Sequence, residues 1–198
     1  MDSGLRKSQE REDVVPSSLL EKGIVYWFFR PRVNVEEAHG VNEVARSFMV
    51  LRPTPKGAVL GAEQGSIAAD AHCRLLFLPK KKFPVTGKER DIGTVEKAGI
   101  STKELQESFI SGNKYETETR GERTKPEAKP YAEGVYALTS TRRATHLAYV
   151  LTIPSEPGSM QEDFGIHQRG SWIMQSKNPK YPSPPSARFG KDPEYPDR

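Results

Sequence analysis

The feature that most constrains the fold is a run of four consecutive aromatic residues, Tyr26–Phe29, inside the segment from Gly23 to Val33. If this segment is an extended strand, successive side chains point to opposite faces, so each face carries two large rings. One face must then pack on a hydrophobic core. The other face is either covered as well or forms a binding surface, for which Tyr26 and Trp27 are the candidate aromatic residues.

The length and composition of the chain favour one domain with loose ends. The 198 residues are enough to bury a single core, and although only 35% are hydrophobic, they gather in a few dense runs. We expect a flexible segment at residues 1–16, a single globular domain at 17–178 and a disordered or extended tail at 179–198. The tail is rich in proline, which cannot donate to a strand ladder.

Most of the apolar runs are short and bounded by turn residues, which is typical of strands. The expected strands are residues 23–33, 48–52, 73–78, 92–98, 134–139, 146–153 and 171–176. Residues 113–130 are highly charged, and we expect a loop or an exposed ribbon there.

One segment, residues 101–111, carries clear helix signals. Ser101 and Glu104 have capping-box spacing, and Gly112 follows as a stop. Weaker signals predict helical turns at 16–22, within 35–47 and at 159–165. Because strands outnumber convincing helices, we predict an α+β or mainly β fold, with a mostly antiparallel sheet or partly closed barrel and one clear helix.

The charge balance is mildly basic, with 30 Lys and Arg against 26 Asp and Glu and a net charge of +4. This charge is compatible with an anionic partner but is far below that of a dedicated DNA-binding domain. The single cysteine forms no disulfide within the chain, which favours a reducing compartment. We find neither a secretory signal nor an apolar run long enough to span a bilayer. These observations predict a cytoplasmic or nuclear protein that does not enter membranes.

Basic residues stand at the ends of two expected strands, which suggests anion binding. Arg30 and Arg32 follow the aromatic run, and Lys80, Lys81 and Lys82 follow the strand at 73–78. Basic side chains close to aromatic rings can neutralise phosphates and stack bases. The leading hypothesis is therefore a non-enzymatic binding module for an anionic partner, with nucleic acid as one class. The alternative is that these cations are solvated strand ends that block edge pairing.

A second hypothesis is a small hydrolase or phosphate-handling enzyme, although the patterns lean against an enzyme. No G-x-S-x-G, G-x-x-x-x-G-K-[ST] or G-x-G-x-x-G motif occurs. If the hairpin of 134–139 and 146–153 brings Glu133 and His146 together, His146 can act as a base that the carboxylate orients. Neighbouring arginines would then hold a phosphate or carboxylate: Arg120, Arg123, Arg142 and Arg143.

The sequence predicts no metal site and no cofactor. The four histidines are scattered without an H-x-H or H-x-x-x-H pair, and one cysteine cannot build a thiolate site. A third functional hypothesis is a protein–protein adaptor that uses the aromatic surface.

Several phrases of the chain resemble an uncharacterised family of filamentous fungi that has longer relatives in bacteria. The resemblance covers about residues 19–182 and rests on these segments: Glu21–Val33, His39–Arg46, Tyr115–Gly121, Glu133–Leu138, His146–Tyr149 and Lys177–Pro179. Some fungal members carry the label "BTB domain transcription factor", which implies a nuclear or adaptor role. The resemblance assigns no activity and no catalytic residues.

Overall fold

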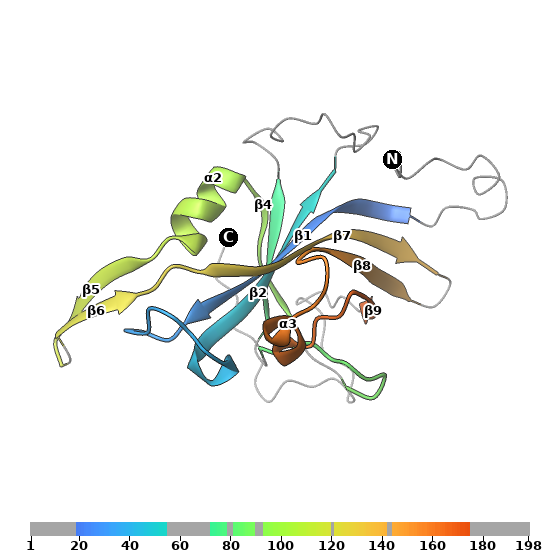
Figure 1. Ribbon diagram of the computed structural model, residues 1–198. Coiled ribbons are helices and arrows are strands. Elements are labelled where there is room, and N and C mark those ends of the chain that lie inside the picture. The colour runs from blue at the N-terminus through green and yellow to red at the C-terminus, as the bar shows by residue number, and fades with distance from the viewer. Residues whose placement is uncertain are drawn as a thin grey trace, which may run out of the picture.

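The computed structural model describes residues 19–54, 72–78, 81–89, 93–119, 121–141 and 144–174, and within these ranges the chain is mostly antiparallel sheet. A seven-stranded sheet has the order β4-β3-β2-β1-β7-β8-β9, and β5 and β6 form a separate ribbon (Figure 1). The strands are β1 Leu19–Pro31, β2 Val44–Pro53, β3 Cys73–Leu78, β4 Thr94–Ile100, β5 Asn113–Thr117, β6 Gly121–Lys125, β7 Lys129–Ser140, β8 Thr145–Ile153 and β9 Arg169–Met174. The predicted fold class is confirmed, and the sheet is open rather than closed into a barrel.

The aromatic run lies on the central strand β1, where both faces of the sheet are covered by other parts of the chain. Trp27 and Phe29 lie on one face, called the first face below, where α3 (Ser159–Phe164) contributes Phe164 to the core. Phe28 lies on the second face, under the helix α2 (Thr102–Leu105), which contributes Leu105. Burying each large apolar side chain stabilises the fold by about 1.5–3 kcal/mol. The aromatic run therefore lies between two hydrophobic cores and contributes rings to both.

The predicted helix at 101–111 is confirmed as α2 and a following π-helical turn, Gln106–Ile110. The Ser101 hydroxyl accepts a hydrogen bond from the backbone N–H of Glu104 at 3.1 Å, as the capping pattern predicts. Leu105 is buried, and Phe109 and Ile110 pack against the second-face core. One apolar stripe therefore holds this segment on the sheet.

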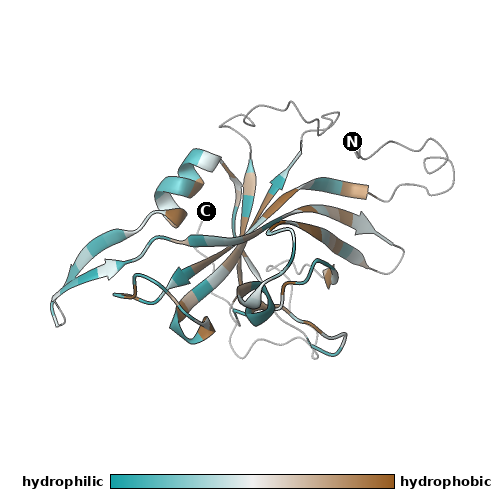
Figure 2. Ribbon diagram, in the orientation of Figure 1, coloured by the Kyte–Doolittle hydropathy of each residue, from teal (hydrophilic) through white to brown (hydrophobic). Residues whose placement is uncertain are grey.

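The predicted charged ribbon is also present. β5 and β6 pair in antiparallel register from Asn113–Lys125 to Thr117–Gly121. The ribbon projects from the side of the sheet (Figure 1). Figure 2 shows that it is predominantly hydrophilic, whereas hydrophobic residues concentrate on the strands of the large sheet.

Three helical predictions were wrong in whole or in part. Within 35–47 only a 3-10 turn forms at Val41–Glu43, because Val44 onward pairs with β1 as strand β2. Residues 19–22 belong to β1 rather than to a helical turn, because they pair with β7. The helix at 159–165 exists as α3, but Gly158 is its N-cap: its N–H donates to the Gln161 side chain at 2.9 Å. The expected tails at 1–16 and 179–198 lie outside the described residues.

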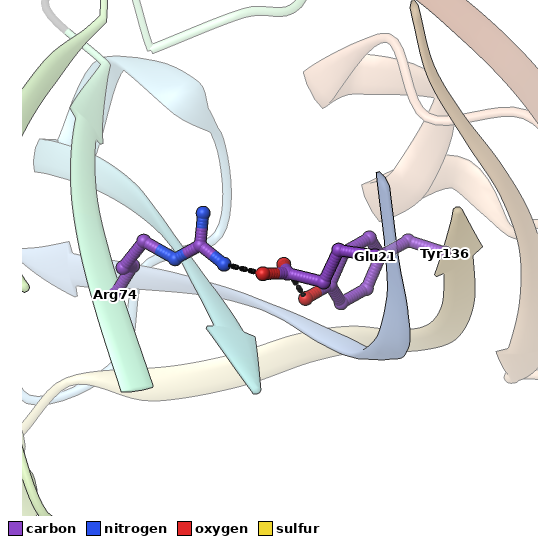
Figure 3. A network of polar contacts seen from close by, with 3 residues as sticks. All are labelled: Glu21, Arg74 and Tyr136. Atoms are coloured by element: carbon purple, nitrogen blue, oxygen red, sulfur yellow. Dashed lines mark hydrogen bonds and ion pairs between the residues drawn. The ribbon is translucent and has the colours of Figure 1, made fainter. Parts of the chain in front are cut away.

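A polar network joins three strands on the first face (Figure 3). The Glu21 carboxylate of β1 accepts a hydrogen bond from the Tyr136 hydroxyl of β7 at 2.5 Å and from the Arg74 guanidinium of β3. Burial, the hydrogen bond to Glu21 and the Glu21 charge raise the pKa of Tyr136. The Tyr136 phenol therefore stays protonated and donates to the Glu21 carboxylate, which links β1, β3 and β7.

Candidate functional site: a basic cluster beside the helical segment

Two arginines occupy opposite positions in the β1–β2 ladder. Arg30 pairs with Arg46, and both side chains belong to the second face, next to the π-helical turn. Residues directly opposite each other in an antiparallel pair have Cβ atoms about 4.5–5.5 Å apart, and like charges there are destabilising. Each guanidinium therefore needs its own stabilising contacts.

Backbone carbonyl groups provide these stabilising contacts for Arg30. Its guanidinium donates to the carbonyl oxygens of Phe109 and Pro126. Burial lowers the pKa of Arg30, whereas the nearby Glu127 raises it. Arg30 thus connects β1 to the end of the helical segment and to the residues that precede β7.

Arg46 is exposed and lies on an aromatic ring. Its guanidinium carbon is 5.6 Å from the ring centroid of Phe77, within the range of a cation–π contact. This contact positions the guanidinium without using its N–H groups. In the described ranges, the ion pairs found do not include Arg46.

Lys125, at the end of β6, completes what we call the basic cluster: Arg30, Arg46 and Lys125. Burial lowers the pKa of Lys125, and the positive charges of Arg30 and Arg46 lower it further. Arg30 and Arg46 are therefore each close enough to Lys125 to repel its ammonium group. Within the described ranges, Glu127 is the carboxylate that acts on Arg30, so there the three cations outnumber it.

The adjoining ribbon extends this surface. Tyr115 pairs with Arg123, and Asn113 pairs with Lys125, so Tyr115, Arg123 and Lys125 share one face of the ribbon. Tyr115 is 38% exposed. An accessible ring consequently lies on the same face as two cations.

The sequence-predicted anion-binding residues divide into two groups. Arg30 belongs to the basic cluster, whereas Arg32 is exposed beyond the register shift that follows Arg30. The Lys81 ammonium donates to the carbonyl oxygen of Val44, and Lys82 is exposed on the same loop. Lys80 lies outside the described residues. Sequence reasoning missed Arg46 and Lys125, which only the strand pairing brings to Arg30.

The structure does not bring Glu133 and His146 together, so the premise of the enzyme hypothesis was wrong. Glu133 pairs with Ile153 near one end of the β7–β8 ladder, and His146 pairs with Thr139 near the other. Glu133 and Thr139 are six positions apart on the same strand, which is roughly 20 Å. Of the proposed arginines, Arg123 lies on the ribbon, and three are outside the described residues: Arg120, Arg142 and Arg143.

The predicted aromatic surface is also corrected. Trp27 is 0% exposed and packs edge-on against Tyr149, because the first face is covered at this point. Tyr26 is partly buried on the second face, where its hydroxyl accepts a hydrogen bond from Arg52 at 3.1 Å. Apolar side chains of the sheet that are exposed lie elsewhere: Val150 and Ile173 on the second face, and also Leu19, Leu20, Val95 and Ile153. The adaptor hypothesis therefore lacks the aromatic surface that it invoked.

Two further properties concern the described part of the chain alone. It contains no group of three His, Cys, Asp or Glu side chains that could hold a metal ion. None of its helices has the length and apolar character needed to cross a bilayer.

Comparisons with protein-family models, curated proteins and solved structures each gave no match. The resemblance to a fungal and bacterial family therefore stays a prediction. Any functional conclusion must rest on the side chains themselves.

Proposed function

We propose that this protein is a non-enzymatic binding module for an anionic partner, and that the partner is single-stranded nucleic acid. The observation that supports this proposal is the basic cluster, in which Arg30 and Arg46 oppose each other beside Lys125. Such an arrangement is unfavourable for an isolated protein. An anion bound between Arg46 and Lys125 would relieve the repulsion.

Each residue has a distinct task in the proposed complex. Arg46 presents a planar guanidinium that can hold a phosphate through two hydrogen bonds, and Lys125 adds a point charge. Arg30 keeps its hydrogen bonds to the carbonyl oxygens of Phe109 and Pro126 and attracts the anion through its positive charge. The partner approaches from the solvent side of the cluster.

The neighbouring aromatic ring favours nucleic acid over other polyanions. Tyr115 is exposed on the ribbon face that also carries Arg123 and Lys125. Stacking of a base on an aromatic side chain contributes about 1–3 kcal/mol and tolerates any sequence. Unpaired bases are free to stack in this way, whereas a paired duplex is not. A cytoplasmic or nuclear location is part of the proposal, since that is where such strands occur.

Fluorescence anisotropy with a labelled single-stranded oligonucleotide of mixed sequence tests the proposal. The Arg46→Gln/Lys125→Gln variant should bind roughly tenfold more weakly, a ratio that corresponds to about 1.4 kcal/mol. The matched control, Lys22→Gln/Lys97→Gln, removes the same charge from exposed positions elsewhere on the sheet. Equal weakening in both variants, or no binding by the wild type, overturns the proposal.

A further inference from the structure

A separate cavity of about 170 Å³ lies between the second face of the sheet and α2. Tyr26, Arg52 and Cys73 form its polar floor, one from each of the strands β1, β2 and β3. The helical segment contributes the opposite wall, including Thr102 and Gln106. Four apolar side chains complete the lining: Phe28, Val50, Leu105 and Ile110.

This cavity is distinct from the basic cluster. Tyr26 and Arg30 point to the same face of β1, four residues apart, which corresponds to roughly 13 Å. The rings of Phe28 and Phe48 stack between the two places at a centroid distance of 5.3 Å. The inference below therefore rests on Tyr26 and Arg52 and is independent of the proposed function.

The floor of the cavity is rich in hydrogen-bond donors. Arg52 donates to the Tyr26 oxygen at 3.1 Å, and within the described ranges no acceptor is found for the phenolic hydrogen of Tyr26. The Nε–H of Arg52 is buried and has no hydrogen-bond partner in the structure. The ion pairs of the described residues do not include Arg52. That Nε–H is too enclosed to face the cavity, so a ligand there would meet the rest of the Arg52 guanidinium.

We propose that this cavity binds a small monocarboxylate with an apolar body. The two carboxylate oxygens would accept hydrogen bonds from the guanidinium of Arg52 and from the hydroxyl of Tyr26. The apolar body would pack against Phe28 and Leu105. The binding is non-covalent, so no bond is formed or broken.

Size and charge select this ligand class. A cavity of about 150 Å³ lined by apolar side chains accepts a molecule of the size of benzene, and this cavity is slightly larger. Glu133 pairs with Tyr26 in the β1–β7 ladder, and its charge acts on the Tyr26 hydroxyl. That negative charge disfavours a doubly charged phosphate more than a singly charged carboxylate. The apolar lining disfavours any anion that lacks a hydrophobic part.

An NMR titration with benzoate tests the proposal, with benzyl alcohol as the neutral probe and inorganic phosphate as the anion without an apolar body. Benzoate should bind saturably in the millimolar range or more tightly, as expected for so small a ligand. Amide shifts should concentrate in β1, β2 and α2. Benzyl alcohol should bind roughly tenfold more weakly, because it cannot form the charged contact with Arg52. Phosphate should not compete.

Two variants locate the site. Arg52→Met keeps much of the side-chain volume and should weaken benzoate roughly tenfold or more. Because Arg52 is partly buried and its replacement can affect folding, the exposed Gln106→Trp offers a second test: the indole should fill the mouth and abolish binding. Glu107→Trp, exposed on the same turn and outside the lining, is its control. Absence of saturable benzoate binding overturns the proposal, as does equal binding of benzoate and benzyl alcohol, or benzoate affinity unchanged in Gln106→Trp.

Discussion

Arg30 and Arg46 face each other across the β1–β2 ladder, but among the residues that the structure describes only Arg30 has backbone acceptors for its guanidinium. Arg30 holds the end of the helical segment and the residues before β7 on the sheet. Arg46 lies over the ring of Phe77 and stays exposed. One arginine of the pair therefore connects elements of the fold, and the other is exposed to solvent.

This difference predicts that two similar substitutions change the free energy of unfolding by unequal amounts. Arg30→Gln should lower the free energy of unfolding by about 2 kcal/mol, because hydrogen bonds from a charged donor contribute about 1.5–3 kcal/mol. Arg46→Gln should change it by less than about 0.5 kcal/mol, as is usual for surface positions. Urea denaturation measures both values. An equal loss in the two variants would contradict the division of tasks between the two arginines.

A second prediction concerns the close approach of β1 and β2 at Gly23. A Cβ atom at this position would lie 2.1 Å from the carbonyl oxygen of Arg52, a backbone atom that cannot move aside. Gly23→Ala should therefore destabilise the protein by about 1–3 kcal/mol, as overpacked sites do. Gly40→Ala is the matched control, because nothing lies within 4 Å of its Cβ position and its φ of −168° is extended. Thermal unfolding of the two variants should separate them clearly; a stable Gly23→Ala protein would mean that the strands lie further apart.

A third prediction concerns alkaline pH. Burial and the contact with Glu21 raise the pKa of Tyr136 above its ordinary value of 10.0, so the folded protein keeps the phenolic proton when the unfolded chain has lost it. The contribution of Tyr136 to stability should therefore be fully present below about pH 10 and be lost as the pH rises above it. Tyr136→Phe removes this group, and the fall should be shallower.

At neutral pH the same Tyr136→Phe variant should be less stable than the wild type by about 1–2 kcal/mol, because Glu21 loses one of its two partners. Denaturant curves at pH 7 and at pH 10.5 measure both effects. An alkaline loss that is identical in wild type and variant would show that Tyr136 does not contribute to it.

A fourth prediction concerns the single thiol. Cys73 is 1% exposed on β3, and burial raises its pKa. Because the thiolate is the reactive form, native protein at pH 8 should react with a disulfide reagent far more slowly than protein in denaturant. Rapid reaction of the native protein would show that the cover over the second face opens readily.

Local signals in the sequence predicted the elements but not the site. The aromatic run predicted a central strand, and Ser101 with Glu104 predicted the helix, because alternation and capping involve residues close in the chain. The stretch around Val44 also has apolar residues at helical spacing, which predicted a short helix within 35–47. It became a strand because pairing with β1 buries Val44, Phe48 and Val50, a gain that local spacing does not reveal.

The basic cluster depends on strand register and could not be predicted in the same way. Arg30 and Arg46 meet only when β1 and β2 pair with one particular offset, and Lys125 arrives through a ribbon almost 80 residues further along the chain. Register also excluded the pair of Glu133 and His146. A long hairpin placed these residues near opposite ends of the ladder, although its turn was correctly expected between them.

The salt dependence of oligonucleotide binding tests the central claim most directly. The logarithm of the association constant should fall linearly with the logarithm of salt concentration, with a slope of about −0.7 for each phosphate neutralised on a single strand. If Arg46 and Lys125 each neutralise one phosphate, Arg46→Gln/Lys125→Gln should have a slope about 1.4 shallower than that of wild type. Lys22→Gln/Lys97→Gln should keep the wild-type slope. Parallel lines for wild type and Arg46→Gln/Lys125→Gln would contradict the assignment of the basic cluster as the anion-binding site.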